Sequence, residues 1–143
     1  MTSEEKKAIL LEYRRLDARI NRAIAEQQRW RDLAIRITPV YSGMPRGGGS
    51  GDKLLDAVQH IADMEADIDR EIDRLVSLRQ TIEASIAAVQ DERLRDILRR
   101  RYIDGDRMER IAVDLCLDYR WVRRLHARAL ARLTLESPPK SVL

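Results

Sequence analysis

The stretch MERIAVDLCLDYRWVRRLHARALARL, Met108 to Leu133, decides how the C-terminal part of the chain folds. Its apolar residues fall at the spacing of a helix-turn-helix, in which two helices cross and each buries one side against a core. Ala112 stands where the two helices cross and only a small side chain fits. The expected core positions are Ile111, Leu115, Leu117, Val122 and Leu125. The pattern predicts a helix from Met108, a tight turn, and a second helix at residues 119–133.

Two residues of the predicted turn carry information about its backbone. The turn requires a positive φ at Cys116, so a cysteine there carries a strain on the order of 1 kcal/mol that glycine would avoid. Asp118 is a good N-cap for the second helix, because its carboxylate can accept hydrogen bonds from the free amides of the first turn. Cys116 is therefore the one departure from the helix-turn-helix pattern.

The predicted helix at residues 119–133 has arginines on one side and no acidic residue. At 100° per residue, its apolar side chains gather on the side opposite the guanidinium groups. Four of the arginines recur every fourth residue, and their repulsion costs a few tenths of a kcal/mol per pair. The five arginines are Arg120, Arg123, Arg124, Arg128 and Arg132. Such a helix predicts a polyanionic partner.

Double-stranded DNA matches this helix in charge and in width. Its phosphates release counterions to arginine, and its major groove admits an α-helix whose arginines can make bidentate contacts to guanine. The first turns of such a helix reach the bases. We therefore expect base contacts from Tyr119, Arg120, Arg123 and Arg124. We expect DNA backbone contacts from Arg128, Arg132 and Trp121.

Two simpler interpretations stand beside this one. The arginines could serve only to keep the protein in solution, although the N-terminal part of the chain intersperses acidic residues among its arginines and this helix does not. Trp121 could pack against a neighbouring helix instead of meeting DNA.

A third helix is predicted just before this unit. Asp91 can cap it, and Gly105 fits the left-handed position beyond its end. Its apolar residues are Leu94, Ile97 and Leu98. Residues 91–136 therefore predict a three-helix domain, and the prolines that follow Ser137 leave residues 137–143 as a flexible tail.

Two long heptad patterns precede this domain. The first runs from Ile9 to Ile37 and stops before Pro39, and the second runs from Leu54 to Val89. Helices at about residues 3–37 and 52–90, joined by a glycine-rich loop at 38–51, should fold back as an antiparallel, coiled-coil-like hairpin. The polar residues that interrupt the patterns, and that are expected to set their register, are Gln27, Glu65 and Arg79.

The hairpin leaves several apolar residues half covered. These residues are Leu55, Ala62, Val76 and Leu78. We therefore expect residues 1–90 to assemble a homodimer or to bind another partner.

The composition favours an all-α protein. Of the 143 residues, 36% are charged and 4% are aromatic, which is typical of long helices with many ion pairs. The formal net charge is only +3, which does not by itself indicate a nucleic-acid partner. With a single cysteine and no long apolar run, we expect a cytoplasmic protein that has no intrachain disulfide and does not enter a membrane.

The sequence resembles two groups of proteins. The stretch YIDGDRMERIAVDLCLDYRWVRRLHARALARL resembles the promoter-reading region 4 of primary-type sigma factors, above all in its "DG", "IA", "VRRL" and "RAL..L" elements. The stretch ITPVYSGMPRGGGSGDK, the heptad helices around it, and RRLHARAL together resemble a family of uncharacterised bacteriophage and prophage proteins with a sigma-like C-terminal helix-turn-helix. This second resemblance covers nearly the whole chain.

The resemblance implies a phage- or prophage-encoded, sequence-specific transcriptional regulator, similar to late-gene activators. It would bind DNA in the cytoplasm of a bacterial host and could contact RNA polymerase. By carry-over from the sigma pattern, the groove-facing positions are Tyr119, Arg120, Arg123 and Arg124, and Cys116 stands where that pattern has glycine. Two other classes remain open: a DNA-packaging component resembling a small terminase subunit, and a protein-interaction module that binds the polymerase or an acidic partner.

No pattern in the sequence indicates an enzyme. His60, Asp63 and Asp67 share one helix face, but a metal site would need further ligands from a second helix. The glycine-rich loop lacks the GK[ST] ending of a phosphate-binding loop. Cys116 has no base beside it, and His126 leans toward the apolar side of its helix, where we expect it to pack. We therefore expect no catalytic residue, no metal, no cofactor and no small-molecule substrate.

Overall fold

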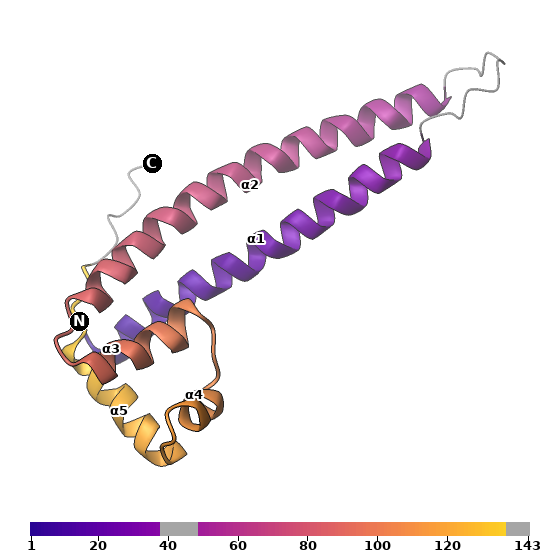
Figure 1. Cartoon of the computed structure of the whole chain (residues 1–143). Helices are drawn as coiled ribbons and strands as arrows, with labels where there is room; N and C mark the ends of the chain where they lie inside the picture. Colours follow the sequence, from indigo (N-terminus) through magenta and orange to yellow (C-terminus); the bar gives the residue numbers. More distant parts are fainter. Residues whose placement is uncertain (38–48, 137–143) are drawn as a thin grey trace. The chain divides into compact units, whose positions relative to one another are not determined.

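The computed structural model describes residues 1–37 and 49–136. Its elements are α1 (Ser3–Ile37), α2 (Gly49–Ala87), α3 (Glu92–Leu98), the π-helix η1 (Arg99–Ile103), α4 (Met108–Asp114) and α5 (Tyr119–Arg132). As predicted, α1 and α2 form a long antiparallel hairpin, and three short packed helices follow (Figure 1). Residues 38–48 of the predicted loop and the predicted tail at 137–143 lie outside the described residues.

The chain divides into two compact units, which we call the core unit and the arm unit. The core unit consists of Met1–Asp17 and Arg74–Leu143, and the arm unit is Ala18–Asp73. Both long helices contribute residues to each unit. The sequence analysis divides the chain at residue 91, between two helices. It does so because the sequence does not reveal that Leu10 and Ile86 belong to the same hydrophobic core as the C-terminal helices.

The first helix begins where the sequence predicts, at Ser3, and Thr2 supplies its cap. The backbone N–H of Glu5 donates to Thr2 Oγ1 at 3.2 Å, and the Thr2 N–H donates to the Glu5 carboxylate at 2.9 Å. This reciprocal pair is a capping box, which satisfies donors that the first turn would otherwise leave free.

The second helix begins and ends about three residues earlier than predicted. It starts at Gly49 and ends at Ala87. Its end is set by a tight turn, in which the N–H of Val89 donates to the carbonyl oxygen of Ile86 at 3.0 Å. Asp91 then caps α3, accepting hydrogen bonds from the N–H groups of Arg93 and Leu94 as predicted.

The heptad pattern of the hairpin is correct at most of its apolar positions and wrong at Val58. Tyr13, Leu16 and Ile20 are buried on α1. On α2, however, Ala57 is buried at 1% exposure, whereas Val58, which follows Leu54 by four residues in the heptad pattern, is 51% exposed. A straight α-helix has 3.6 residues per turn, whereas a strict heptad repeat assumes 3.5. Over a long helix, the heptad positions therefore rotate away from the line of contact.

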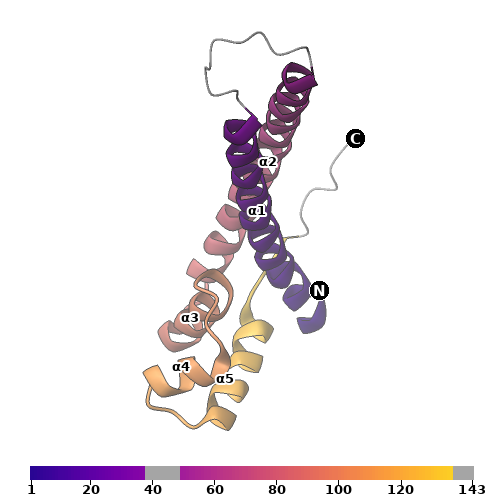
Figure 2. The ribbon, with the colours of Figure 1, turned by 90° about the vertical axis from the view of Figure 1, so that its right-hand side faces the viewer.

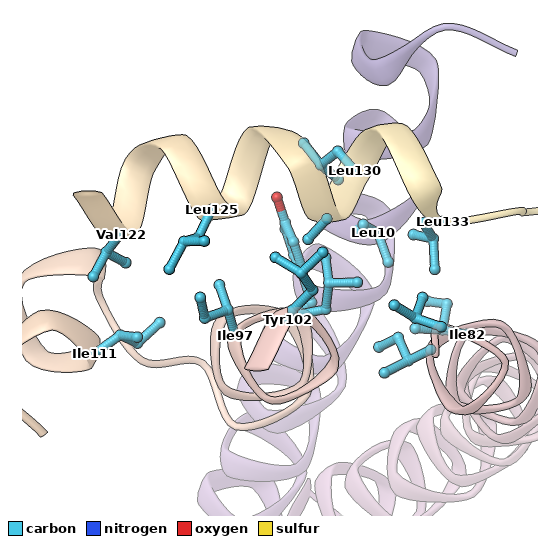
Figure 3. Packing of buried hydrophobic residues seen from close by; sticks show 14 of the residues in the cluster. Leu10, Ile82, Ile97, Tyr102, Ile111, Val122, Leu125, Leu130 and Leu133 are labelled. Atoms are coloured by element: carbon cyan, nitrogen blue, oxygen red, sulfur yellow. The ribbon is translucent and has the colours of Figure 1, made fainter. Parts of the chain in front are cut away.

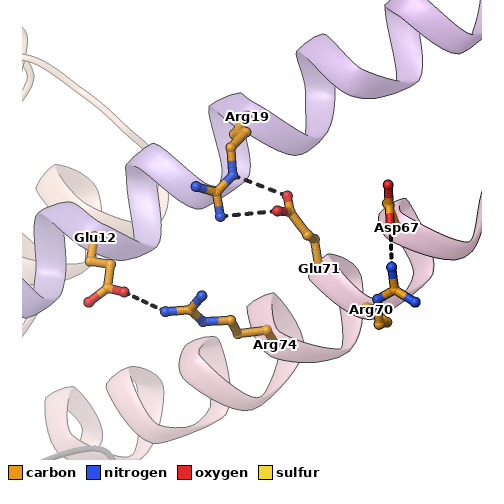
Figure 4. A network of polar contacts seen from close by, with 6 residues as sticks. All are labelled: Glu12, Arg19, Asp67, Arg70, Glu71 and Arg74. Atoms are coloured by element: carbon orange, nitrogen blue, oxygen red, sulfur yellow. Dashed lines mark hydrogen bonds and ion pairs between the residues drawn. The ribbon is translucent and has the colours of Figure 1, made fainter. Parts of the chain in front are cut away.

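Ion pairs connect the two helices of the hairpin within each unit (Figure 4). In the core unit, Arg74 pairs with Glu12 at 2.8 Å. In the arm unit, Arg19 pairs with Glu71 at 3.2 Å. These groups are largely exposed, so each pair contributes little to stability.

The two polar residues of the arm-unit seam bind each other. Gln27 is buried, and its amide nitrogen donates to the Glu65 carboxylate at 2.5 Å and to the Ile61 carbonyl oxygen at 3.3 Å. Arg79, the third predicted interruption, pairs instead with Glu83 on its own helix, at 3.0 Å.

The core unit is built around α5, which packs against α3 and α4. Figure 3 shows Val122 and Leu125 pointing from α5 toward Ile111 and Ile97. The ends of the long helices supply Leu10 and Ile82, both fully buried. In two views the short helices lie together, with the turn between α4 and α5 at the edge of the group (Figure 1, Figure 2).

The π-helix η1 was not predicted. It follows α3 without a break, and its extra residue per turn places Tyr102 in the core at 1% exposure. Gly105 lies just beyond η1 with a φ of 81°, the left-handed conformation that the sequence predicts. A Cβ at this glycine would lie 2.9 Å from Nη2 of Arg14, whose Nη1 donates to the Arg101 carbonyl oxygen at 3.2 Å.

Among residues 1–37 and 49–136, no helix is long and apolar enough to cross a membrane.

Candidate nucleic-acid interface

The buried side of α5 fixes the orientation of its opposite side. Val122 and Ala129 are fully buried, and Leu125 and Leu130 are at most 6% exposed. On α4, Ile111 and Ala112 are buried, whereas Leu115 and Leu117 of the turn are half-buried against the same core. The helix-turn-helix therefore holds α5 by one side along its length.

The turn between α4 and α5 has the geometry of a Schellman motif. The N–H of Leu117 donates to the Ala112 carbonyl oxygen at 2.9 Å, and the N–H of Cys116 donates to that of Val113 at 3.1 Å. Cys116 has a φ of 55°, the positive value that the sequence predicts for this position, and its side chain is exposed. This motif usually has glycine at that position, because glycine adopts positive φ without a steric cost.

Asp118 occupies the N-cap position of α5, but its predicted side-chain hydrogen bonds are not formed. Its carboxylate makes no cap hydrogen bond, although its carbonyl oxygen accepts the N–H of Val122 at 3.0 Å. The prediction was right about the position and wrong about the contact. The N–H groups of the first turn are thus left without a side-chain cap from Asp118.

Lys6 holds the opposite end of α5. Its Nζ donates to the carbonyl oxygens of Leu130 at 2.9 Å and Ala131 at 3.3 Å, and the side chain is only 9% exposed. These carbonyls belong to the last turn, where a cation also meets the negative end of the helix dipole. The sequence analysis missed this contact. Its signal is the position of Lys6 four residues before Leu10, on the buried stripe of α1.

The five arginines of α5 are exposed to solvent and have no carboxylate partner among residues 1–37 and 49–136. They are Arg120, Arg123, Arg124, Arg128 and Arg132. All ion pairs within the described part of the chain involve other residues. Like charges therefore accumulate on one surface, with α5 itself contributing no acidic residue.

Two aromatic residues flank these arginines. The Arg123 guanidinium carbon lies 5.8 Å from the ring centre of Tyr119, and that of Arg128 lies 5.5 Å from the ring centre of Trp121. As whole residues, Tyr119 and Trp121 are 39% and 37% exposed, respectively. Each cation–π contact favours a guanidinium position at the surface without neutralising its charge. Trp121 thus contacts an arginine of its own helix and remains partly open to solvent.

His126 lies at the border between the buried and basic sides of α5, and it packs as predicted. Its Nε2 is joined to Tyr102 Oη by a hydrogen bond of 2.6 Å. Burial lowers the pKa of His126 to about 4, with the nearby charges of Lys7, Arg101 and Arg123 acting in the same direction. Burial also raises the pKa of Tyr102 to about 12. Both groups are therefore neutral at pH 7, and His126 adds no positive charge to α5. The sequence analysis did not foresee the partner of His126.

Among the residues that the structure describes, no group of three or more His, Cys, Asp or Glu side chains could hold a metal ion. The candidate interface is therefore the exposed, charged side of α5, whose apolar side is buried in the core. Comparisons with protein-family models, curated proteins and solved structures found no match to this chain.

Proposed function

We propose that the protein is a sequence-specific DNA-binding transcriptional regulator that places α5 in the major groove. One observation carries the proposal: five exposed arginines share a helix without acidic residues, and none has a carboxylate partner among the described residues. The repulsion between arginines four residues apart is relieved when phosphates replace solvent counterions.

The first two turns of α5 carry the base contacts in this proposal. Arg120 and Arg124 lie one turn apart on the side opposite the buried Val122 and Leu125, so a groove can receive both. Arg123 and Tyr119 form a stacked pair on the flank of the same turns. Arginine is the residue best suited to bidentate recognition of guanine.

The later part of α5 carries the contacts to the DNA backbone. Arg128 is held against Trp121, and Arg132 lies in the last turn. Both residues suit phosphate contacts, which set the position of a helix along DNA but read no sequence. The N–H groups at the start of α5, which Asp118 does not cap, suit a further phosphate.

Three arginines of the hairpin contrast with those of α5, which have no carboxylate partner among the described residues. Arg19 and Arg74 reach across to carboxylates on the other helix of the hairpin, and Arg79 pairs along its own helix. The regulatory part of the proposal rests on the resemblance to sigma region 4, and the phage or prophage origin rests on the resemblance to the family of phage and prophage proteins.

The test is selection of bound duplexes from a random DNA pool, followed by titration of the selected duplex at several salt concentrations. We expect an enriched sequence and a binding constant that falls linearly with salt on a logarithmic scale. No binding at low salt would overturn the proposal. Salt-dependent binding without any enriched sequence would leave a nonspecific DNA-binding protein and overturn the sequence-specific part. A closed ring of many subunits would favour the packaging alternative.

A further inference from the structure

The arm unit exposes large apolar side chains on both of its helices. On α1, Ile24 is 45% and Ile35 is 71% exposed. On α2, Leu55 is 68% and Val58 is 51% exposed. A helix pair that exposes several such residues together has a surface suited to another protein surface.

These residues lie on one side of the hairpin. Ile24, Arg31 and Ile35 are spaced by seven and four residues, so they form one stripe of α1. Val58 and Glu65 are spaced by seven residues on α2 and share a stripe there. Arg31 pairs with Glu65 at 3.4 Å, which shows that the two stripes border the same side of the seam. We call this surface the arm face.

The charges of the two helices determine what fits the arm face. Residues 18–37 of α1 contain five arginines and two carboxylates, a net charge of +3. Residues 49–73 of α2 contain eight carboxylates and two basic residues, a net charge of −6. A partner should therefore set acidic residues against α1 and basic residues against α2. A second copy of this chain meets that requirement.

We propose that the arm face pairs with the arm face of a second copy, with the two hairpins parallel and α1 of each copy against α2 of the other. In the resulting four-helix arrangement, each helix has only neighbours of opposite net charge. The antiparallel alternative would place α1 against α1 and α2 against α2, and like charges would face each other. The parallel arrangement also brings Ile35 of one copy to the level of Leu55 of the partner subunit.

The parallel arrangement has a consequence for the rest of the chain. Residues 17 and 74 of both copies, where each chain continues into its core unit, lie at the same end of the paired arms. This arrangement suits two-fold symmetric DNA sites. The inference itself does not depend on DNA binding, because the mass of the protein tests it without any nucleic acid.

The first test is the mass of the full chain by sedimentation or light scattering at micromolar concentration. We expect twice the 16.6 kDa of one chain. Replacing Leu55→Lys and Val58→Lys together should raise the dissociation constant of the dimer at least about tenfold, because four charges would enter an apolar interface. Both residues are exposed, so the fold of one chain should survive, which circular dichroism can verify.

Leu33→Lys is the matched control. Leu33 is 43% exposed and stands nine residues from Ile24, half a turn away around α1, so it lies outside the arm face. Its replacement should leave the mass unchanged. A monomer at these concentrations, or a dimer that survives the paired substitution at Leu55 and Val58, would overturn the proposal. A monomer that binds RNA polymerase through the arm face would identify a different occupant.

Cross-linking tests the direction of the hairpins. In a Cys116→Ser background, chains with Ile35→Cys are mixed with chains that carry either Leu55→Cys or Ile24→Cys, and the mixtures are oxidised. The parallel arrangement predicts a mixed disulfide with the Leu55→Cys chain. A disulfide only with the Ile24→Cys chain would show an antiparallel pairing and refute the arrangement proposed here.

Discussion

Lys6 Nζ lies 2.9 Å from the carbonyl oxygen of Leu130, although 124 residues separate the two in the chain. The first turns of α1 thereby hold the last turn of α5, the helix that carries the exposed arginines. The orientation of the candidate interface depends on the N-terminal end of the chain as well as on α3 and α4.

Replacing Lys6→Ala should destabilise the protein. The carbonyls of Leu130 and Ala131 would lose a buried charged donor, at a cost of about 1–3 kcal/mol in the free energy of unfolding. Urea-induced unfolding measures this change. Lys53→Ala, at an exposed position of α2, is the control and should have almost no effect. Equal stabilities of the two variants would contradict the role given to Lys6.

The protein should lose stability as the pH falls from about 6.5 to about 4. The pKa of His126 is about 4 in the folded protein and 6.5 in its ordinary state, so between these values the unfolded chain binds more protons than the folded one. The free energy of unfolding therefore decreases with falling pH, by about 2 kcal/mol after allowance for partial exposure of the ring. Above pH 6.5 this contribution is fully present.

The variant His126→Gln isolates this effect. Glutamine keeps a hydrogen-bonding group near Tyr102 but does not titrate, so the pH dependence of urea unfolding between 6.5 and 4 should become shallower. His60→Gln, at an exposed position of α2, should retain the slope of the original protein. An unchanged slope in His126→Gln would show that other groups dominate.

Replacing Cys116→Gly should stabilise the protein. The φ of 55° costs a non-glycine residue on the order of 1 kcal/mol, and glycine removes most of that cost while adding some freedom to the unfolded chain. We expect a net gain of about 0.5 kcal/mol, visible as a higher midpoint in denaturant. Cys116→Ala removes the thiol but keeps the strain, and it should show no gain. A gain of the same size in both variants would implicate the thiol instead.

If α5 binds DNA as proposed, replacing two of its arginines should affect DNA binding in two different ways. Replacing Arg124→Ala should weaken binding to the selected duplex by about 1–3 kcal/mol and relax the preference at one base pair. Replacing Arg132→Ala should weaken binding to all sequences alike and reduce the salt slope by about one charge. Fluorescence anisotropy at several salt concentrations measures both.

Arg22→Ala provides the control for these two variants. Arg22 is an exposed arginine of α1 that has no ion pair within the described residues, so its removal changes the net charge by the same amount as the others. Its variant should bind with the original affinity and slope. Indistinguishable losses in Arg22→Ala and Arg124→Ala would reduce the role of α5 to its net charge.

Much of the fold could be predicted because its signals are local. Each of these signals acts over a few residues of sequence. They are the proline after Thr38, the cap at Asp91, and the left-handed residues Cys116 and Gly105. The one-sided charge of α5 is equally local, and its arginines are exposed in the structure. The DNA contacts assigned to them stay a prediction.

The features that escaped prediction depend on distant residues. The π-helix η1 places Tyr102 against His126, and the sequence of η1 alone does not specify that partner. In the sequence, Lys6 cannot be distinguished from an ordinary surface lysine. Only the fold shows that it lies beside the carbonyl groups at the end of α5. In the seam of the hairpin, Ala57 is buried where the heptad pattern predicts Val58. This difference reflects small changes of helix rotation that accumulate over a long helix.

The shared core of the chain ends also bears on biosynthesis. Leu10 and Tyr13 of α1 leave the ribosome well before Leu130 and Leu133, yet all four belong to the same buried cluster. Because translation proceeds toward the C-terminus, the cluster stays incomplete until α5 has emerged. Contacts between such distant segments slow folding. The apolar stripe of α1 therefore stays exposed to other molecules until α5 has been synthesised and has packed against it.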